Sequence, residues 1–344
     1  MINHPLISLN NTVFLRDDKL VILDRRRFPG ELVEVLCSHY EDVARAIEDM
    51  AVQGAGDIAI TAGYGLFLSA CQLPANILSQ TETAKAQLEQ ARNRLAQTRP
   101  TGFHLAALLK RLMDGLSGEP AVWADQILAS LNKIVEQQQL RSELTAQWGE
   151  TLLEDGDTVL SHCFPGAALP LMLYKALKNG KEVKLIATET RPYLQGARLT
   201  SWVASELGVN TTLITDNMVA HCMSRGMITS VFTAADRIAL DGTVANKIGT
   251  LQIALLAQHY GIPVHILGYG PPDKNTTEGK DIPIEMRDPD EVRNFHGTRI
   301  TGEQVEAIYP AFDLTPPQLI RSIITDRGII KPNEISTYWS LPRA

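Results

Sequence analysis

The chain is poor in the residues and patterns that mark several common classes of protein. It has four cysteines in 344 residues, and no two of them form a C-x-x-C pair, so neither a disulfide framework nor a zinc knuckle is expected. The eight histidines include no H-x-x-x-H pair and form no cluster with a cysteine at ligand spacing. We therefore predict reduced thiols and no metal site, and nothing in the chain calls for a bound cofactor.

Positive charge and long apolar runs are also scarce. Lys and Arg number 32 against 39 Asp and Glu, and the formal net charge of -7 argues against nucleic acid as the main partner. No window reaches about 18 uninterrupted apolar residues, and the first residues show no basic segment followed by an apolar run. Neither export nor a membrane partner is indicated, and the cytoplasm is the expected location.

The overall composition, 44% hydrophobic and 21% charged, is typical of a globular protein. The length of 344 residues is enough for roughly two domains. Residues 12–24 read as two short strands around the Asp17-Asp18 turn, and helical spacing of apolar residues begins at Tyr40. Further helices are expected over residues 84–96, 105–116 and 121–152. We predict an N-terminal domain of strands and helices over residues 1–150.

From Asp157 onward, short Val, Ile and Leu runs alternate with amphipathic segments of helix length. Strands are expected at residues 158–163, 182–188, 211–214, 230–234 and 263–267, and helices over 171–177, 197–207, 218–224 and 247–259. Such alternation is typical of a parallel sheet covered on both faces. We predict an α/β chain whose second domain, residues 151–344, is a Rossmann-like doubly wound sheet followed by an extended C-terminal arm from Lys331.

In doubly wound sheets, ligands bind beyond the carboxyl ends of the strands, and Cys163, Glu189 and Asp236 fall at such ends. Cys163 is either a small buried residue that closes a strand or a reactive thiol, whose pKa the helix start just after it would lower. Asp236 is either a capping or ion-paired residue or an acid with a chemical role. His162 would point to the opposite strand face from Cys163, which makes it a poor general base.

Asn246 and Lys247 are expected where the helix of residues 247–259 begins. The first amide groups of a helix have no intrahelical partner, so a phosphate there would meet N–H donors, the helix dipole and an ammonium group. The alternative is a surface lysine.

Gln53-Gly-Ala-Gly-Asp57 opens a Gly-rich segment that lacks the P-loop and dinucleotide fingerprints. It serves either close helix packing or the approach of a ligand to the backbone.

Long runs of the chain resemble the methylthioribose-1-phosphate isomerase family, which shares its fold with the regulatory alpha, beta and delta subunits of translation initiation factor 2B. The resemblance extends over almost the whole chain, from Leu23 to Ile330. Its most specific runs are residues 189–200 (ETRPYLQGARLT), 214–218 (ITDNM), 235–238 (ADRI), 244–250 (VANKIGT), 283–289 (PIEMRDP) and 310–316 (PAFDLTP).

The resemblance implies an N-terminal helical domain, a Rossmann-like C-terminal domain and a homodimer. The implied activity is an aldose-ketose isomerisation that converts a 5-substituted ribose 1-phosphate to the ribulose 1-phosphate, as in methionine salvage. Catalytic roles are implied for Cys163 and Asp236. The substrate, a small phosphorylated sugar, would be bound by Gln53, Gly54, Ala55, Arg99, Gln195, Asn246 and Lys247.

The chemistry of an aldose 1-phosphate explains the two catalytic roles. Its anomeric oxygen is esterified, so the sugar cannot open to a free aldehyde, and an acid must protonate the ring oxygen. Asp236, if an apolar pocket keeps it protonated, is suited to supply that proton and to act as a base once the ring opens. Cys163 would either carry a proton from C2 to C1 or, as a thiolate, stabilise positive charge during hydride transfer.

The glycine-rich loop departs from the family. Isomerases of this family usually carry Arg-Gly-Ala-Pro-Ala where this chain has Gln53-Gly-Ala-Gly-Asp57, so the loop loses a cation and gains a carboxylate. We therefore expect altered specificity, with 5-deoxyribose 1-phosphate and 5-methylthioribose 1-phosphate both open, whereas ribose 1,5-bisphosphate would want more positive charge. The alternatives are a regulatory protein like the initiation-factor subunits, which would not need Cys163 and Asp236, and an isomerase scaffold that has lost activity.

Overall fold

The computed structural model describes residues 4–99 and 103–342. It separates into two compact units, Met1–Gln139 and Leu140–Ala344, and the division falls within helix α5 (Trp123–Glu150). The domain boundary expected at residue 150 stays a prediction. Within the described ranges, no helix combines the length and the apolar character that crossing a membrane requires.

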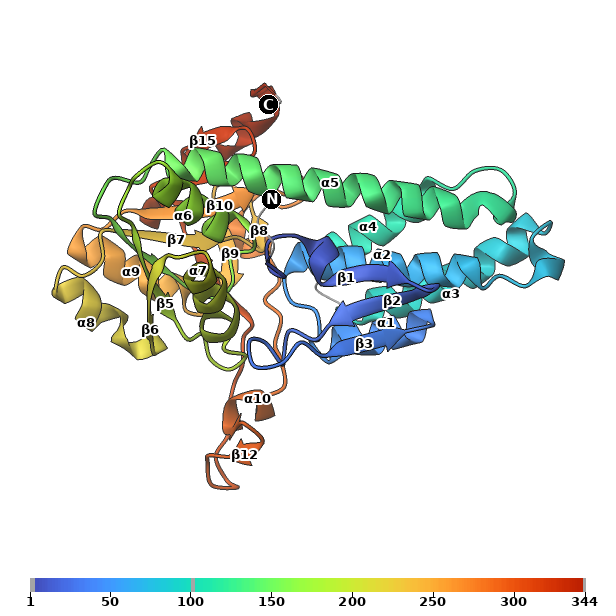
Figure 1. Cartoon of the computed structure of the whole chain (residues 1–344), viewed down its shortest axis with the longest axis horizontal. Helices are drawn as coiled ribbons and strands as arrows, with labels where there is room; N and C mark the ends of the chain where they lie inside the picture. Colours follow the sequence, from blue (N-terminus) through green and yellow to red (C-terminus); the bar gives the residue numbers. More distant parts are fainter. Residues whose placement is uncertain (1–3, 100–102, 343–344) are drawn as a thin grey trace. The chain divides into compact units, whose positions relative to one another are not determined.

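The first unit begins with a three-stranded antiparallel sheet in the order β1-β2-β3 (Figure 1). β1 (Val13–Arg16) and β2 (Lys19–Leu23) are the two expected strands, and Asp17 and Asp18 turn between them with φ angles of 49° and 59°. β3 (Glu34–Cys37) is not predicted by the sequence pattern. Only Cys37 of its four residues is buried, so the strand shows little of the alternation that reveals a half-buried strand.

The helices of the first unit pack around α2 in one apolar core. Their bounds are α1 (Tyr40–Glu48), α2 (Ala55–Cys71), α3 (Thr81–Gln97) and α4 (Phe103–Asp114), followed by the first part of α5. Nearly every residue of α2 from Ile58 to Ala70 is buried. A Cβ atom on Gly63 would lie 2.5 Å from Leu131 Cδ2, so this part of the Gly-rich segment serves close helix packing.

A seven-stranded sheet forms the centre of the second unit, in the order β15-β14-β10-β7-β4-β5-β6 (Figure 1). All neighbouring pairs are parallel except β14 and β15, which run antiparallel. The strands are β4 (Thr158–Ser161), β5 (Lys184–Thr188), β6 (Asn210–Ile214), β7 (Ser230–Ala234), β10 (Val264–Tyr269), β14 (Ser322–Thr325) and β15 (Gly328–Ile330). The first five are the strands that the sequence predicts.

Successive side chains of these strands enter two separate apolar cores. Val159 and Leu185 pack with α6 (Ala168–Lys178) and α7 (Ser201–Glu206) on one face. Leu160 and Ile186 pack with α8 (Val219–Ser224) and α9 (Thr250–Tyr260) on the other. Strand residues are apolar on both faces because helices cover both. The predicted α/β class, with a Rossmann-like doubly wound sheet after a helical region, is confirmed.

A second, three-stranded sheet in this unit corrects one expectation. β9 (Val244–Lys247) lies between β8 (Arg237–Ile238) and β13 (Phe312–Thr315), with antiparallel pairing on both sides. Asn246 and Lys247 therefore end a strand, and α9 begins only at Thr250, so the prediction of a helix start at this pair is wrong. The pairing with β13 is made across a long stretch of chain, and local periodicity does not reveal it.

The remaining elements of the second unit lie toward its C-terminus. α10 (Asp290–Arg293) precedes a short hairpin of β11 (Asn294–Phe295) and β12 (Thr298–Arg299). The expectation of an extended arm from Lys331 is wrong, because Pro332–Ser340 forms a 3-10 helix, η8. Ile335 and Tyr338 are both buried, and their spacing of three residues matches the period of that helix.

Candidate functional site

The order of the large sheet reverses next to β4. From β4 the chain proceeds to β5 and β6 on one side, and then crosses to β7, β10 and β14 on the other. Cys163 lies two residues after the end of β4, and Asp236 lies two residues after the end of β7. Since β4 and β7 are neighbouring parallel strands, both residues lie at the edge where doubly wound sheets bind their ligands.

Cys163 is held in an unusual backbone conformation. Its φ angle is 62°, in the left-handed region that residues other than glycine rarely adopt. Its N–H donates to Thr190 Oγ1 at 2.8 Å, and its carbonyl oxygen accepts from Thr200 Oγ1 at 2.5 Å. Strain that neighbouring side chains maintain in this way is concentrated at functional sites.

The thiol of Cys163 is not activated in the way that the sequence suggests. Burial raises the pKa of this thiol to about 11, which outweighs the lowering effect of the Lys247 ammonium. The carboxylates of Asp236 and Asp216 raise the pKa further. Helix α6 begins at Ala168, close to the expected position, but burial outweighs any effect of the helix, so the expected lowering of the thiol pKa is wrong.

Asp236 and the Asn246-Lys247 pair lie next to each other through backbone pairing. The Asp236 N–H donates to the carbonyl oxygen of Ala245 at 2.9 Å, and Ala245 directly precedes Asn246 in β9. The charges of Asp236 and Lys247 both act on the pKa of the Cys163 thiol. Cys163, Asp236 and Lys247 therefore share one electrostatic environment.

The α9 helix start differs from the phosphate site that the sequence predicts. The N–H groups of Gly249 and Leu251 already donate to the carboxylate of Asp313, at 2.7 and 3.1 Å. Asp313 lies opposite Asn246 in the β13–β9 pair, so tertiary pairing places this acid where the phosphate was expected. Local sequence analysis gives no sign of this role for Asp313. The groups that remain to bind a phosphate are the side chains of Asn246 and Lys247 in β9.

Both β9 side chains are buried polar groups. Asn246 is 3% exposed, and its Nδ2 donates to Thr250 Oγ1 at 2.9 Å. Lys247 is 8% exposed, and its Nζ lies 5.0 Å from the ring centre of Phe312. The alternative of a surface lysine is therefore excluded. An ammonium group at such a depth is suited to an anionic ligand, because little solvent competes for it.

Gln195 is a further buried polar residue at this sheet edge. It is 4% exposed, and its Oε1 has no hydrogen-bond partner among the described residues. It directly precedes η4 (Gly196–Thr200), a stretch of π-helix, and such stretches are frequent at functional sites. A Cβ atom on Gly196 would lie 1.8 Å from the carbonyl oxygen of Thr188, so only glycine lets this segment approach β5.

His162 has a supporting position. Its Nε2–H donates to the carbonyl oxygen of Ile248 at 2.9 Å, which fixes the tautomer and leaves Nδ1 to accept from Thr188 Oγ1 at 2.7 Å. Burial lowers the pKa of this imidazole, so it stays neutral. With both nitrogens engaged, His162 holds the segment that leads to α9 and is unsuited to proton transfer.

The first unit holds the glycine-rich loop. Gly54, with a φ angle of 103°, caps α2, and the loop continues through Ala55 into the helix. Asp57 does not face solvent as an isolated charge, because its carboxylate accepts from Arg25 Nη2 and from Gln138 Nε2, both at 2.6 Å. Arg25 also donates to the backbone carbonyl oxygen of Gln53 at 2.5 Å. The loop is therefore held by a buried ion pair.

The first unit also brings Arg99 toward this loop. Its Nη1 lies 2.9 Å from the Sδ atom of Met50, and the Met50 carbonyl oxygen accepts from Gln53 Nε2 at 3.3 Å. The Oε1 atom of Gln53 is buried, and none of the residues that the structure describes donates to it.

The predicted site residues form two groups, one in each unit. Gln53, Gly54, Ala55 and Arg99 lie in one unit, and Cys163, Gln195, Asp236, Asn246 and Lys247 lie in the other.

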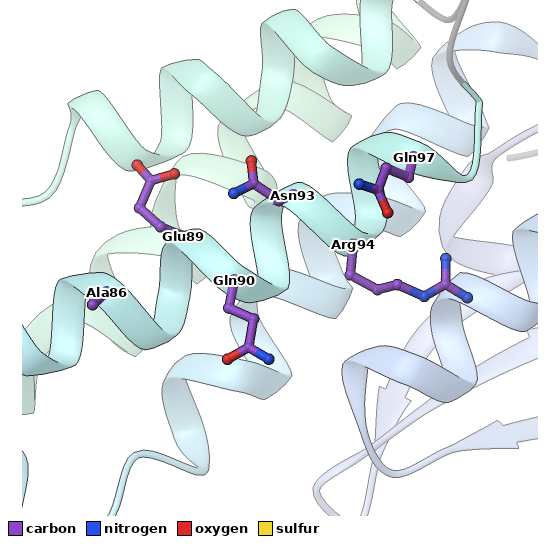
Figure 2. A pocket seen from close by; sticks show the side chains of 6 residues that line it. All are labelled: Ala86, Glu89, Gln90, Asn93, Arg94 and Gln97. Carbon is purple, nitrogen blue, oxygen red and sulfur yellow. The ribbon is translucent and has the colours of Figure 1, made fainter.

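A surface hollow elsewhere in the first unit contains none of these residues. The hollow has a volume of about 510 Å³. Figure 2 shows the side chains of α3 that line it, which are Ala86, Glu89, Gln90, Asn93, Arg94 and Gln97. Most of these are exposed side chains of a solvent-facing helix, and we assign no function to them. Across residues 4–99 and 103–342, no three His, Cys, Asp or Glu side chains gather as ligands of a metal ion would.

Comparison with known proteins gives long matches. Residues 51–332 match the initiation factor 2 subunit family. Over 331 residues, the chain is 40% identical to the methylthioribose-1-phosphate isomerase of Petrotoga mobilis, and the match covers 92% of this chain and 93% of that protein.

Two solved structures share the fold. The crystal structure of 5-methylthioribose 1-phosphate isomerase from Pyrococcus horikoshii OT3 superposes with a TM-score of 0.84 at 34% identity, covering 96% of this chain and 94% of that one. The crystal structure of subunit delta of translation initiation factor eIF-2B from A. fulgidus superposes with a TM-score of 0.78, also at 34% identity. That match covers 93% of this chain and 96% of the subunit. The same fold is thus shared by an enzyme and by a translation factor subunit.

Proposed function

Because this chain belongs to the initiation factor 2 subunit family, and an acid and a thiol lie at the edge of its sheet, we propose that it is an aldose-ketose isomerase. It converts a 5-substituted or 5-deoxy ribose 1-phosphate to the corresponding ribulose 1-phosphate, as in methionine salvage or 5-deoxyribose salvage. The observation that carries this proposal is the common environment of Cys163, Asp236 and Lys247 beyond β4 and β7. The names of the enzymes that it resembles support the substrate class.

In this reaction Asp236 is the acid and then the base. It protonates the ring oxygen of the sugar, the bond from that oxygen to C1 breaks, and the carboxylate receives the proton of the C2 hydroxyl as the C2 carbonyl forms. One hydrogen moves from C2 to C1, so the acid is regenerated and no external oxidant is needed. The position of Asp236 directly after a buried strand, with its backbone fixed to Ala245, supports this role.

Cys163 serves the transfer of hydrogen from C2 to C1. As a proton carrier it must accept the C2 proton before returning it to C1, and as a charge stabiliser in hydride transfer it must be ionised, so both routes need the thiolate. A pKa of about 11 leaves about one thiol in ten thousand ionised at pH 7. Turnover in deuterated water separates the routes, because a proton route brings solvent deuterium to C1 and a hydride route does not.

Substrate binding in this proposal uses both groups of residues. Lys247, Asn246 and Gln195 in the second unit bind the phosphate and sugar oxygens. This is supported by the buried ammonium group and by Gln195 Oε1, which has no hydrogen-bond partner within residues 4–99 and 103–342. We include Arg99 and the Gln53, Gly54 and Ala55 segment as further substrate contacts. The backbone amides of this segment precede a helix, where an anion is favoured.

The ion pair at the glycine-rich loop limits the choice of substrate. Asp57 is neutralised by Arg25, so the carboxylate gained in this loop does not act as an unpaired negative charge. The loop still has an uncharged Gln53 where isomerases usually carry arginine. This favours a substrate with one phosphate and an uncharged C5 substituent, such as 5-methylthioribose 1-phosphate or 5-deoxyribose 1-phosphate, over ribose 1,5-bisphosphate.

The decisive experiment is a substrate panel. Purified protein is incubated with 5-methylthioribose 1-phosphate, 5-deoxyribose 1-phosphate and ribose 1,5-bisphosphate, and the ketose 1-phosphate is followed by NMR. Turnover of either of the first two with a kcat/KM at least about tenfold above that for the bisphosphate is the expected result. Absence of turnover with all three contradicts the proposal.

A second candidate is a regulatory protein that binds other proteins. The 34% identity to subunit delta of initiation factor eIF-2B favours it. A regulatory subunit has no need for a strained Cys163 beside Asp236, so we place this function second. The regulatory function becomes the better explanation if the substrate panel gives no turnover while the protein is folded.

We further propose that the protein is a homodimer and that it acts in the cytoplasm.

A further inference from the structure

Tyr309 is a buried tyrosine whose hydroxyl group the proposed mechanism does not use. The residue is 2% exposed, and its hydroxyl has no hydrogen-bond partner among the residues that the structure describes. Buried polar groups are nearly always hydrogen-bonded, because losing water without gaining a partner costs stability. Because Tyr309 precedes β13, which pairs with the strand that carries Lys247, a bound ligand is a natural source of the partner.

The segment that carries Tyr309 leads directly into the site. Its carbonyl oxygen accepts from the Arg287 N–H at 2.8 Å, and two residues later the Ala311 carbonyl oxygen accepts from the Ile248 N–H at 3.0 Å. β13 then begins at Phe312, paired with Lys247. Tyr309 is therefore anchored beside the strand that holds the buried ammonium group.

The polar neighbours of Tyr309 are already engaged with one another. The Tyr193 ring centre lies 6.4 Å from that of Tyr309. The Tyr193 hydroxyl accepts from Arg287 Nη2 at 2.6 Å and is also hydrogen-bonded to Glu291. The Arg287 guanidinium forms ion pairs with Glu285 and Glu291 at 3.2 and 3.1 Å. This cluster satisfies its own charges and leaves the Tyr309 hydroxyl for another partner.

The Tyr309 phenol interacts electrostatically with the Cys163 thiol. Burial raises the pKa of the phenol, and the Cys163 sulfur is among the further groups that raise it. The hydroxyl therefore stays protonated at neutral pH. A protonated phenol both donates and accepts a hydrogen bond, as a sugar hydroxyl also does.

We propose that the Tyr309 hydroxyl forms a hydrogen bond with a hydroxyl group of the bound sugar phosphate, beside Cys163. The inference rests on the proposed function and adds a substrate contact to it. Tyr309→Phe removes one oxygen atom that has no hydrogen-bond partner among the described residues. The variant should therefore keep or slightly raise the melting temperature, while kcat/KM falls about tenfold to a hundredfold, mainly through KM.

The matched control is Tyr338→Phe. Tyr338 is equally buried in the same unit, but its hydroxyl donates to Asp326 Oδ1 at 2.8 Å. This control should lose thermal stability and keep the kcat/KM of the parent. A Tyr309→Phe variant with parent kinetics, or one that loses stability without losing affinity, overturns the inference.

Calorimetric titration with the ketose 1-phosphate separates the inference from the proposed function. Weaker binding by Tyr309→Phe supports the inference even if the parent shows no turnover, in which case only the proposed function fails. Equal binding by the parent and the variant overturns the inference even if the parent is an active isomerase. A parent that neither binds nor turns over the sugar phosphate contradicts both.

Discussion

At the residue scale, the proposed chemistry depends on the thiol of Cys163, which burial keeps neutral at pH 7. Burial holds the pKa of Cys163 near 11 although Lys247 opposes the effect. Its backbone has a left-handed conformation, and hydrogen bonds with Thr190 and Thr200 hold it just beyond the end of β4. In the proposed reaction, Cys163 is therefore held in place while its thiol is still neutral. Ionisation of the thiol requires either the bound substrate or a higher pH.

The pH dependence of the reaction follows from this pKa. A thiol with a raised pKa becomes more ionised as pH rises, so kcat/KM should increase between pH 7 and pH 10, by up to about tenfold per pH unit. The steady-state kinetics are measured with circular dichroism at each pH to show that the protein stays folded. A profile that is flat over this range would show that the neutral thiol is the active form.

At the element scale, an aspartate lies at each of two helix starts, but the two aspartates have different partners. Asp57 in the first turn of α2 pairs with Arg25, and Asp313 accepts the first amides of α9. Both acids lie next to segments that we assign to substrate binding. Carboxylates are favoured at helix N-termini, and Asp313 already accepts from the first amides of α9, whereas among the described residues no side chain caps the start of α2.

The Arg25–Asp57 pair should be costly to break from one side. The two side chains are 3% and 17% exposed, so Asp57→Ala removes the carboxylate that forms an ion pair with the buried Arg25 guanidinium group. We expect a loss of about 3 kcal/mol in the free energy of unfolding, measured by urea denaturation. The double variant Arg25→Gln, Asp57→Ala should recover at least half of the loss. Additive losses in the two single variants would show that the pair is not coupled.

Asp313 gives stability a pH dependence of defined sign. Burial raises the pKa of this carboxyl from 3.8 to about 6, so the folded state binds the proton more tightly than the unfolded state. The contribution of Asp313 to stability is therefore largest below about pH 4 and is lost as pH rises to about 6. Above that pH the free energy of unfolding is lowered by up to about 3 kcal/mol relative to the acid value.

Comparison with Asp313→Asn isolates this contribution. The free energy of unfolding of both proteins is measured by urea denaturation from pH 4 to pH 7. As pH rises, the free energy of unfolding of the parent should fall relative to that of the variant, because only the parent has to ionise a buried carboxyl. A constant difference across this range would show that Asp313 titrates as an ordinary surface aspartate.

At the scale of the whole molecule, the sequence allows prediction of the α/β class, five strands of the large sheet and the position of Cys163 and Asp236 at its edge. These depend on hydrophobic periodicity within short segments. The β9 strand and the role of Asp313 depend on pairing between Asn246 and a residue far along the chain, which periodicity does not report. The Arg25–Asp57 pair is missed for the same reason, since it joins two segments with no common local pattern.

The predicted homodimer also belongs to this scale. In the segment of residues 286–308, Met286, Ile300 and Ile308 are 62%, 60% and 78% exposed, and we propose that the partner subunit covers them. We expect sedimentation equilibrium to give a dimer for the parent and a monomer-dimer mixture for Ile308→Asp. Leu255→Asp, at an exposed position on α9, is the control and should stay dimeric. A monomeric parent would contradict the expectation.

The most direct test of the account as a whole is the activity of Asp236→Asn on the best substrate of the panel. Asparagine keeps the size of the side chain but cannot give a proton to the ring oxygen, so kcat should fall at least about a thousandfold with the fold intact. Asp241→Asn, in the turn that follows β8, is the matched control and should keep the parent kcat within about threefold. Parent-like turnover by Asp236→Asn would contradict the acid at the centre of this account.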